Sequence, residues 1–245
     1  MNYKQFRNEL YDQEGGFTMQ AQSTKTTRST FIHYIKDPGS AITHFIAMLM
    51  AIASMPPLIL KASNGTNNEY VLSFITFIVS MILLYGASTI YHTLDLSETK
   101  NNLLRKLDHS MIFIMISGSY TPVCTIVLED RIGNLLLSIV WFIAIGGIVL
   151  KLCWINSPKW LSSVMYILMG WTCVLAFKPI FHSLTQAQFL WLLAGGIIYT
   201  IGGIIYALKL PIFNSRHKNF GSHEIFHLFV MGGSICHFIM MYSLA

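Results

Sequence analysis

Long apolar segments separated by short polar breaks form the main pattern along this chain. Each segment holds about 18 to 21 residues, which at 1.5 Å per helical residue matches the roughly 30 Å hydrocarbon core of a bilayer. Because lipid offers the backbone no hydrogen-bond partners, segments of this kind are predicted to be helices. The predicted spans are residues 41–60, 71–91, 109–128, 132–150, 160–177, 189–208 and 225–244.

This pattern predicts an all-α integral membrane protein, a seven-transmembrane helix bundle that occupies residues 41–245. The fifth span is the weakest, because it is the shortest, contains Gly170 and lies between Lys159 and Lys178. Residues 1–40 are polar and contain no long apolar stretch. We expect them to form a mobile cytoplasmic tail without a cleavable signal peptide.

Composition and charge add an orientation to this picture. The chain is 53% hydrophobic and 11% charged, against roughly 25% charged in soluble domains. Thirteen of the 16 lysines and arginines fall in the N-terminal tail and in the loops on its side of the predicted bundle. Positive loops face the cytoplasm, so the N-terminus is predicted inside and the C-terminus outside. The basic residues lie in short loops without a basic face, so we expect no nucleic-acid partner.

Polar residues inside spans are costly and often functional, and in this chain several fall at one depth. His92 lies at the cytoplasmic end of the second predicted helix, with Ser88 four residues earlier on the same face and about 6 Å deeper. Asp108 opens the third helix, and His223 opens the seventh, with His227 one turn deeper. Three helices are therefore predicted to bring these five residues into one leaflet.

These residue types suit a zinc site. Two imidazoles at positions i and i+4 can bind one ion, and His92 can join His223 and His227 as a third ligand. Three protein ligands leave a fourth position open for water, which is typical of catalytic zinc. Asp108 is then a candidate general base, and Ser88 is a candidate for positioning a substrate carbonyl.

The string His223-Glu224-Ile225-Phe226-His227 also matches the zinc-protease motif H-E-x-x-H. Such proteases take a third ligand from residues after the motif. Residues 228–245 contain no Asp or Glu, and His237 lies about 15 Å deeper and roughly 80° round the helix from His227. The protease reading is therefore disfavoured, and Glu224 is expected to be a supporting or loop-facing carboxylate rather than a base.

Four further residues stay open as contributors to the site. His44 is either a support for the ligands or a capped histidine at the membrane interface. His109 and Asp95 flank the candidates and could replace a ligand. His237 is expected to bond a neighbouring helix rather than a ligand.

Three segments together, "ASTIYHTL", "LDHSMIFIMISGSYTP" and "HEIFHLFVMGGSICHF", resemble the bacterial hemolysin III family. That family belongs to the progestin and adiponectin receptor group, in a superfamily that includes alkaline ceramidases. The resemblance covers roughly residues 35–245. It implies that His92, His223 and His227 hold zinc, with Asp108 and Ser88 near the water on the metal, and that the protein lies in a bacterial plasma (inner) membrane.

These observations together predict a zinc-dependent hydrolase of a lipid amide or ester with a metal-activated water. A membrane lipid is then the expected substrate or ligand. The alternative is a non-enzymatic protein, either a cytolysin, as the family name implies, or a membrane sensor with a structural zinc. A structural zinc usually has four protein ligands, and Asp108 could supply the fourth.

Overall fold

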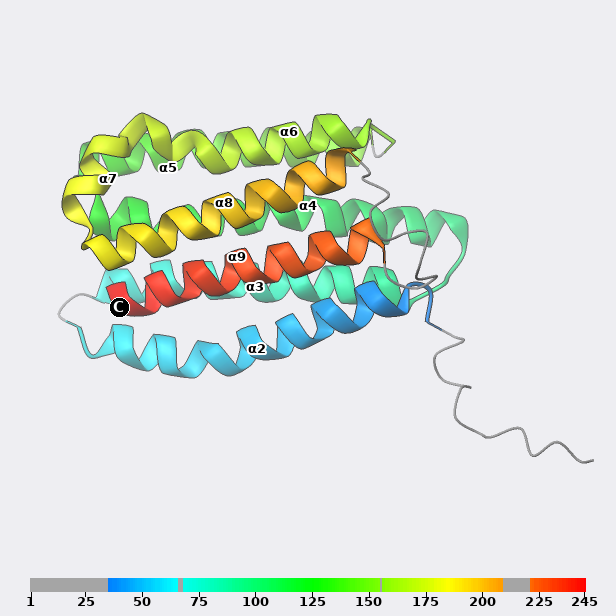
Figure 1. The fold of residues 1–245 in the computed structure, drawn as a ribbon, viewed down its shortest axis with the longest axis horizontal. Helices are drawn as coiled ribbons and strands as arrows, with labels where there is room; N and C mark the ends of the chain where they lie inside the picture. The colour runs from blue at the N-terminus through cyan, green and yellow to red at the C-terminus, as the bar shows by residue number, and fades with distance from the viewer. Residues whose placement is uncertain (1–34, 66–67, 155, 209–220) are drawn as a thin grey trace, which may run out of the picture. The chain divides into compact units, whose positions relative to one another are not determined.

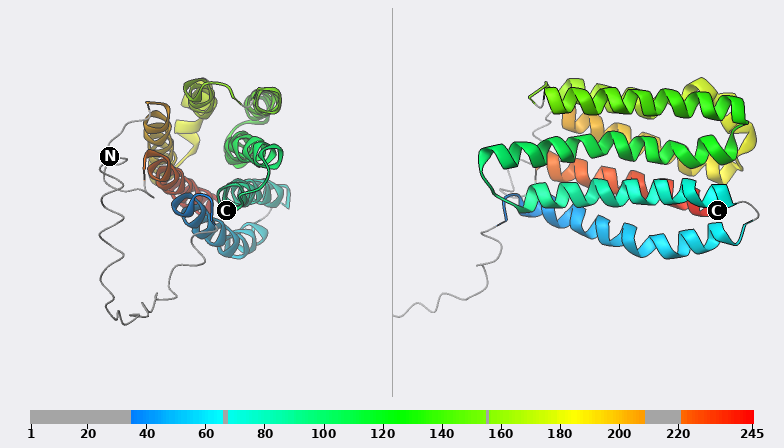
Figure 2. Two further views of the ribbon diagram at one scale, coloured as in Figure 1. Left: turned by 90° about the vertical axis from the view of Figure 1, so that its right-hand side faces the viewer. Right: turned by 180° about the vertical axis from the view of Figure 1, so that it is seen from behind.

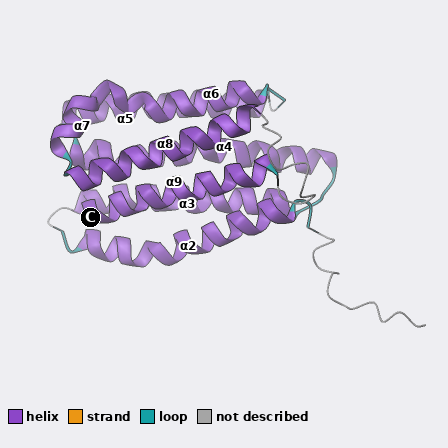
Figure 3. Ribbon diagram, viewed as in Figure 1, coloured by secondary structure: helices purple, strands orange, loops and turns teal. Residues whose placement is uncertain are grey.

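A computed structural model describes residues 35–65, 68–154, 156–208 and 221–245. All of them belong to one compact unit, Phe31–Ala245. The predicted tail, residues 1–40, lies almost entirely outside the described residues, as does the loop at 209–220. Within the described ranges the chain is helical and contains no strand (Figure 3).

The helices follow the order of the predicted spans (Figure 1). They are α2 (Pro38–Ser63), α3 (Asn68–Thr93), α4 (Glu98–Pro122), the π-helical turn η2 (Val123–Val127), α5 (Asp130–Cys153), α6 (Lys159–Gly170), the 3₁₀ segment η3 (Trp171–Ala176), α7 (Phe177–Ser183), α8 (Gln186–Leu208) and α9 (Ser222–Leu244).

Within the described residues, seven helical spans are long and apolar enough to cross a bilayer. Each overlaps one predicted span, and most begin no more than three residues earlier because polar residues complete the first turn of the helix. The third span is the exception: it begins at Glu98, eleven residues before its predicted start at 109, because a polar helical segment precedes its apolar part. Many large apolar side chains on these helices are exposed, as is expected when the surrounding solvent is lipid. The seven-helix fold is confirmed, and the chain is a multi-pass membrane protein.

The seven spans form a ring that closes on itself. Extensive contacts join α2 to α3, α3 to α4, α4 to α5, α6 to α8, α8 to α9, and α9 back to α2. The ring closes less tightly between α5 and the fifth span, where α5 meets η3 and, to a smaller extent, α6. A view along the helix axes shows this arrangement (Figure 2, left). The first and last spans therefore lie side by side, and the starts of α2, α4 and α9 meet the end of α3 at one end of the bundle.

The fifth span differs from its prediction. It runs from Trp160 to Ser183, six residues beyond the predicted end, so Lys178 lies within it rather than bounding it. It stops being α-helical at Gly170 and continues through η3 and α7. The Tyr120 hydroxyl donates to the Gly170 carbonyl at 2.6 Å and accepts from the Cys173 amide at 2.8 Å. The broken helix thus has partners for backbone groups that lipid could not satisfy.

Candidate metal centre

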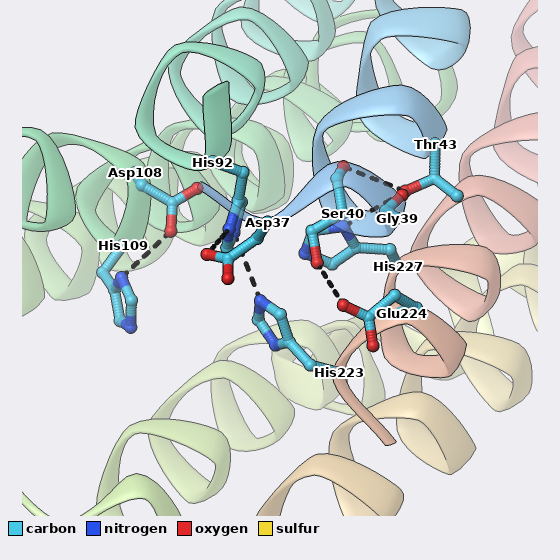
Figure 4. A network of polar contacts seen from close by, with 10 residues as sticks. All are labelled: Asp37, Gly39, Ser40, Thr43, His92, Asp108, His109, His223, Glu224 and His227. Carbon is cyan, nitrogen blue, oxygen red and sulfur yellow. Dashed lines mark hydrogen bonds and ion pairs between the residues drawn. The ribbon is translucent and has the colours of Figure 1, made fainter. Parts of the chain in front are cut away.

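Three histidines from two helices converge at one end of the bundle. His92 lies in the last turn of α3, and His223 and His227 lie in the first two turns of α9 (Figure 4). One ligand atom from each of the three lies within 4.8 Å of the others. These three side chains could together hold a metal ion.

The spacing between the rings suits a shared ion. The Nε2 atoms of His92 and His223 are 3.2 Å apart. Two nitrogens each about 2.05 Å from a tetrahedral zinc are separated by roughly 3.3 Å. The rings of His223 and His227 have their centroids 4.5 Å apart, because i and i+4 side chains lie on one face of a helix.

Asp37 holds the far side of the His92 ring. Its Oδ2 lies 3.0 Å from His92 Nδ1. The Asp37 amide also donates to the His92 carbonyl at 2.9 Å, so backbone and side chain together join the start of α2 to the end of α3. A proton on Nδ1, shared with this carboxylate, leaves the lone pair of Nε2 available to a metal.

Residues of α2 support His227 in a similar way. The Thr43 hydroxyl donates to the carbonyls of Gly39 and Ser40 at 3.0 Å, and His227 Nδ1 lies 3.4 Å from the same oxygen. The Thr43 oxygen therefore connects the His227 ring to the first turns of α2.

His44 packs directly against the cluster. Its ring stacks on His227 with centroids 3.6 Å apart and planes 9° apart, and it meets Tyr85 edge-on at 5.0 Å. It is buried, and neither ring nitrogen has a hydrogen-bond partner among the described residues. The alternative of a capped interfacial histidine is therefore wrong, and His44 lies where a support for the ligands would lie.

Glu224 does not point at the histidines as a protease base would. One carboxylate oxygen accepts from the Ser40 hydroxyl at 2.7 Å, and the other accepts from the Gly221 amide at 2.7 Å (Figure 4). It therefore caps the first turn of α9 and ties it to α2. This placement agrees with its expected role as a supporting carboxylate.

Asp108 and His109 form a pair inside α4, ten residues after its start at Glu98, so Asp108 does not open the helix as the sequence predicted. Asp108 Oδ2 lies 3.1 Å from His109 Nδ1, and Asp108 is buried. His109 is engaged by this carboxylate and does not belong to the histidine cluster. Asp95, the other residue considered as a substitute ligand, is exposed and accepts a hydrogen bond from Asn101 at 3.2 Å.

A cavity of about 220 Å³ joins the candidate residues to the interior of the bundle. Its polar end is lined by His44, Ser88, Asp108, His223 and His227. The Ser88 hydroxyl is buried without a hydrogen-bond partner among the described residues, so it is available to a ligand. The rest of the lining is largely apolar and includes Ile112, Met115, Ile116, Leu193 and Val230.

Comparison with known proteins identifies the family. The profile of the family described as haemolysin-III related matches residues 32–238. The chain belongs to the haemolysin III family. It is 40% identical over 200 residues to a hemolysin-3 homolog of Bacillus subtilis (strain 168), covering 82% of this chain and 90% of that one. It is 39% identical over 211 residues to hemolysin-3 of Bacillus cereus, covering 86% and 91%.

The haemolysin III match extends to more distant receptors. An adiponectin receptor protein of Drosophila melanogaster is 25% identical over 218 residues, which cover 82% of this chain and 49% of that protein. The family expected from the three sequence segments is therefore confirmed, together with its wider group.

Sequence reasoning missed two contributors to this haemolysin III site, Asp37 and Thr43. Both lie at the start of α2, and Asp37 is the residue before Pro38, the first helical residue. An aspartate in that position usually accepts a hydrogen bond from the helix, but Asp37 makes no such capping bond. An acidic residue predicted at the same membrane face as His92 was the available signal.

Proposed function

We propose that this protein is a zinc-dependent hydrolase of a lipid amide or ester. The observation that carries the proposal is one arrangement. Three histidines have converging ring nitrogens, and two of them, His223 and His227, line the polar end of an apolar cavity together with a buried carboxylate and an unpartnered serine hydroxyl. Hydrolysis adds one water across the acyl bond and yields a carboxylic acid and an amine or alcohol.

The donor set supports zinc in particular. Imidazole nitrogen is a preferred zinc ligand, and His92, His223 and His227 would hold the ion with a fourth position left open. The carboxylate of Asp37 would hold a proton on His92 Nδ1 and leave the lone pair of Nε2 toward the centre. A bound zinc ion supplies Lewis acidity and a water that is reactive at neutral pH.

Two residues of the chain would handle the proton and the substrate oxygen. Asp108 would accept the proton of the attacking water and return it to the leaving group, which is general base and then general acid catalysis. His109 contacts one of its two carboxylate oxygens and so restrains its orientation. The Ser88 hydroxyl would donate to the substrate carbonyl oxygen, where negative charge develops.

The cavity supports a lipid as the substrate class. Its lining is mostly apolar, and several lining residues are also exposed on the membrane-facing side of the fifth span, among them Gly170, Val174 and Phe177. An amphiphile could reach the site from the bilayer, with its polar group toward the histidines. We place the protein in the plasma membrane, with the metal end of the bundle toward the cytoplasm.

Metal content and lipid hydrolysis test this proposal on the full-length protein in detergent. We expect about one zinc per chain and release of fatty acid from at least one member of a panel of ceramides, other N-acyl lipids and lipid esters. Asp108→Asn should lower the rate by about 100-fold or more while zinc is retained. Asp95→Asn, an exposed aspartate at the same end of the bundle, is the matched control and should hydrolyse at the wild-type rate.

Two outcomes would overturn the proposal. Less than about half an equivalent of zinc in the wild type would reject the metal centre. Normal zinc content without release from any lipid would reject the hydrolase and favour a structural or sensing metal.

The relatives named hemolysin-3 favour cytolysis as a second candidate function. Dye release from liposomes of bacterial and of mammalian lipid composition distinguishes the two. Leakage that persists in Asp108→Asn would support a lytic protein independent of hydrolysis. Leakage that is lost with that variant would indicate that lysis follows from lipid cleavage.

A further inference from the structure

A second set of buried polar side chains lies deeper in the bundle, away from the metal centre. Ser234 of α9 accepts a hydrogen bond from the Tyr85 hydroxyl at 2.6 Å and contacts the Tyr199 hydroxyl at 2.8 Å. The Tyr199 ring in turn meets the ring of His237 edge-on, with centroids 5.3 Å apart. These groups join α3, α8 and α9 within the apolar interior, where polar residues are costly.

His237 is the member of this set whose polar atoms lack ordinary partners. It is only 9% exposed, and neither ring nitrogen makes a hydrogen bond with the described residues. His237 lines the same cavity as His223 and His227. A buried imidazole with an unsatisfied nitrogen at a cavity wall is suited to bind a polar group inside that cavity.

The interface between α8 and α9 is shaped around these two rings. A Cβ added to Gly195 would lie 2.2 Å from the Cδ2 atom of His237. A Cβ added to Gly233 would lie 2.8 Å from the ring of Tyr199. Glycine at both positions therefore leaves room for the histidine and tyrosine rings between the two helices. The ribbon shows α8 and α9 side by side (Figure 1). Aliphatic packing alone would not require a histidine in that place.

We propose that His237 is a specificity-determining residue that hydrogen-bonds a second polar group of the lipid, part-way along its acyl chain. His237 lies ten residues beyond His227 on α9, which corresponds to about 15 Å. An extended chain of C–C bonds of ~1.5 Å advances about 1.25 Å per carbon, so the second group lies on the order of twelve carbons from the carbonyl. The favoured substrate class is thus a lipid with a mid-chain hydroxyl, and this inference rests on the proposed function.

Binding of product-like fatty acids tests the inference without requiring turnover. The probes are octadecanoic acid, 12-hydroxyoctadecanoic acid and 2-hydroxyoctadecanoic acid, titrated into zinc-loaded full-length protein in detergent. We expect the 12-hydroxy acid to bind about 10-fold more tightly than the unsubstituted acid, as one additional buried hydrogen bond allows. The 2-hydroxy acid places its hydroxyl beside the metal centre, where it can reach the zinc, so any change in its affinity should be the same in His237→Leu as in the wild type.

Variants assign this preference to His237. His237→Leu should bind octadecanoic acid as the wild type does and lose the preference for the 12-hydroxy acid. His237→Gln, which keeps a hydrogen-bonding group, should retain part of it. Gly195→Ala should also reduce the preference, since the added methyl group displaces the ring. His182→Leu, at an exposed histidine of α7, is the matched control and should behave as the wild type.

The outcomes separate this inference from the proposed function. Equal binding of the three acids, binding of none, or an unchanged preference in His237→Leu would overturn the role of His237. Lipid hydrolysis without chain preference would leave the proposed function standing. A chain preference lost in His237→Leu, in a protein that hydrolyses no lipid, would keep the specificity site and reject the hydrolase.

Discussion

Among the buried histidines of this bundle, the partner of each ring nitrogen determines what the ring can do. His92 has Nδ1 held by Asp37 and Nε2 toward His223, and Nδ1 of His227 lies 3.4 Å from the Thr43 hydroxyl oxygen. His44 stacks on His227, and His109 is paired with Asp108. The same residue type therefore serves as candidate ligand, as support and as a carboxylate partner, according to the atoms around it.

Asp37 provides a test at the residue scale. Its carboxylate holds His92 Nδ1 but lies outside the group of candidate ligands. Asp37→Ala should weaken zinc affinity by about 10- to 100-fold, because the ring loses the group that sets its tautomer and orientation. Competition with a chromophoric chelator measures the affinity. Asp95→Ala is the control, and equal affinity in the two variants would show that the Asp37 contact does not influence the metal.

At the element scale, the start of α9 combines candidate ligands with a structural cap. Glu224 satisfies the Gly221 amide and bonds Ser40 of α2, so the middle of the H-E-x-x-H string is committed to the helix terminus. The rings of His223 and His227 contact His92 of α3, and His227 also stacks on His44 of α2. Helix geometry alone separates these roles, because neighbouring residues are about 100° apart around the axis.

Paired glycines in α5 give a matched test of helix packing. A Cβ on Gly147 would lie 2.3 Å from the ring of Phe113 of α4, whereas a Cβ on Gly146 would meet nothing within 4 Å. Because Phe113 is fully buried, its ring has little room to move. Gly147→Ala should cost about 1–3 kcal/mol of stability, and Gly146→Ala should be close to neutral. Thermal unfolding in detergent compares them, and equal midpoints would contradict the close contact between α4 and α5.

For the whole molecule, the packing of α2 against α9 brings together the candidate metal centre and the residues that support it. The candidate ligands come from α3 and α9, and the residues that orient them come from α2. A bound ion would therefore link spans that are far apart in sequence. Stabilisation by such an ion acts on the packing of the whole bundle and not on one helix.

The orientation of the whole molecule can be tested by reporter fusion. Thirteen of 16 basic residues fall on the N-terminal side of the predicted spans, so the C-terminus is predicted outside. A reporter that is active only outside the cytoplasm should be active when fused after Ala245, and a cytoplasmic reporter should be silent there. Activity of only the cytoplasmic reporter would reverse the orientation and move the metal end to the outer face.

The sequence by itself determined the seven spans, the family and the group of candidate residues. The physical reason is that lipid requires long apolar helices, so hydropathy alone locates them and sets the depth of His92, Asp108, His223 and His227. The sequence also predicted that the fifth span is the weakest, because it contains Gly170, but it did not predict that this span extends to Ser183. The position of a span and the weak point within it each depend on a single segment and on the lipid around it.

Only the tertiary structure decided which residues hold those candidates in place. Asp37, Thr43 and His44 contact the histidine cluster because α2 packs against α9. These two helices are the first and last spans in the sequence, and no local pattern predicts that they are neighbours. The cavity, the capping role of Glu224 and the unpartnered ring of His237 likewise depend on which helix faces meet. Depth in the membrane follows from sequence, whereas rotation about each helix axis and the choice of neighbour follow from packing.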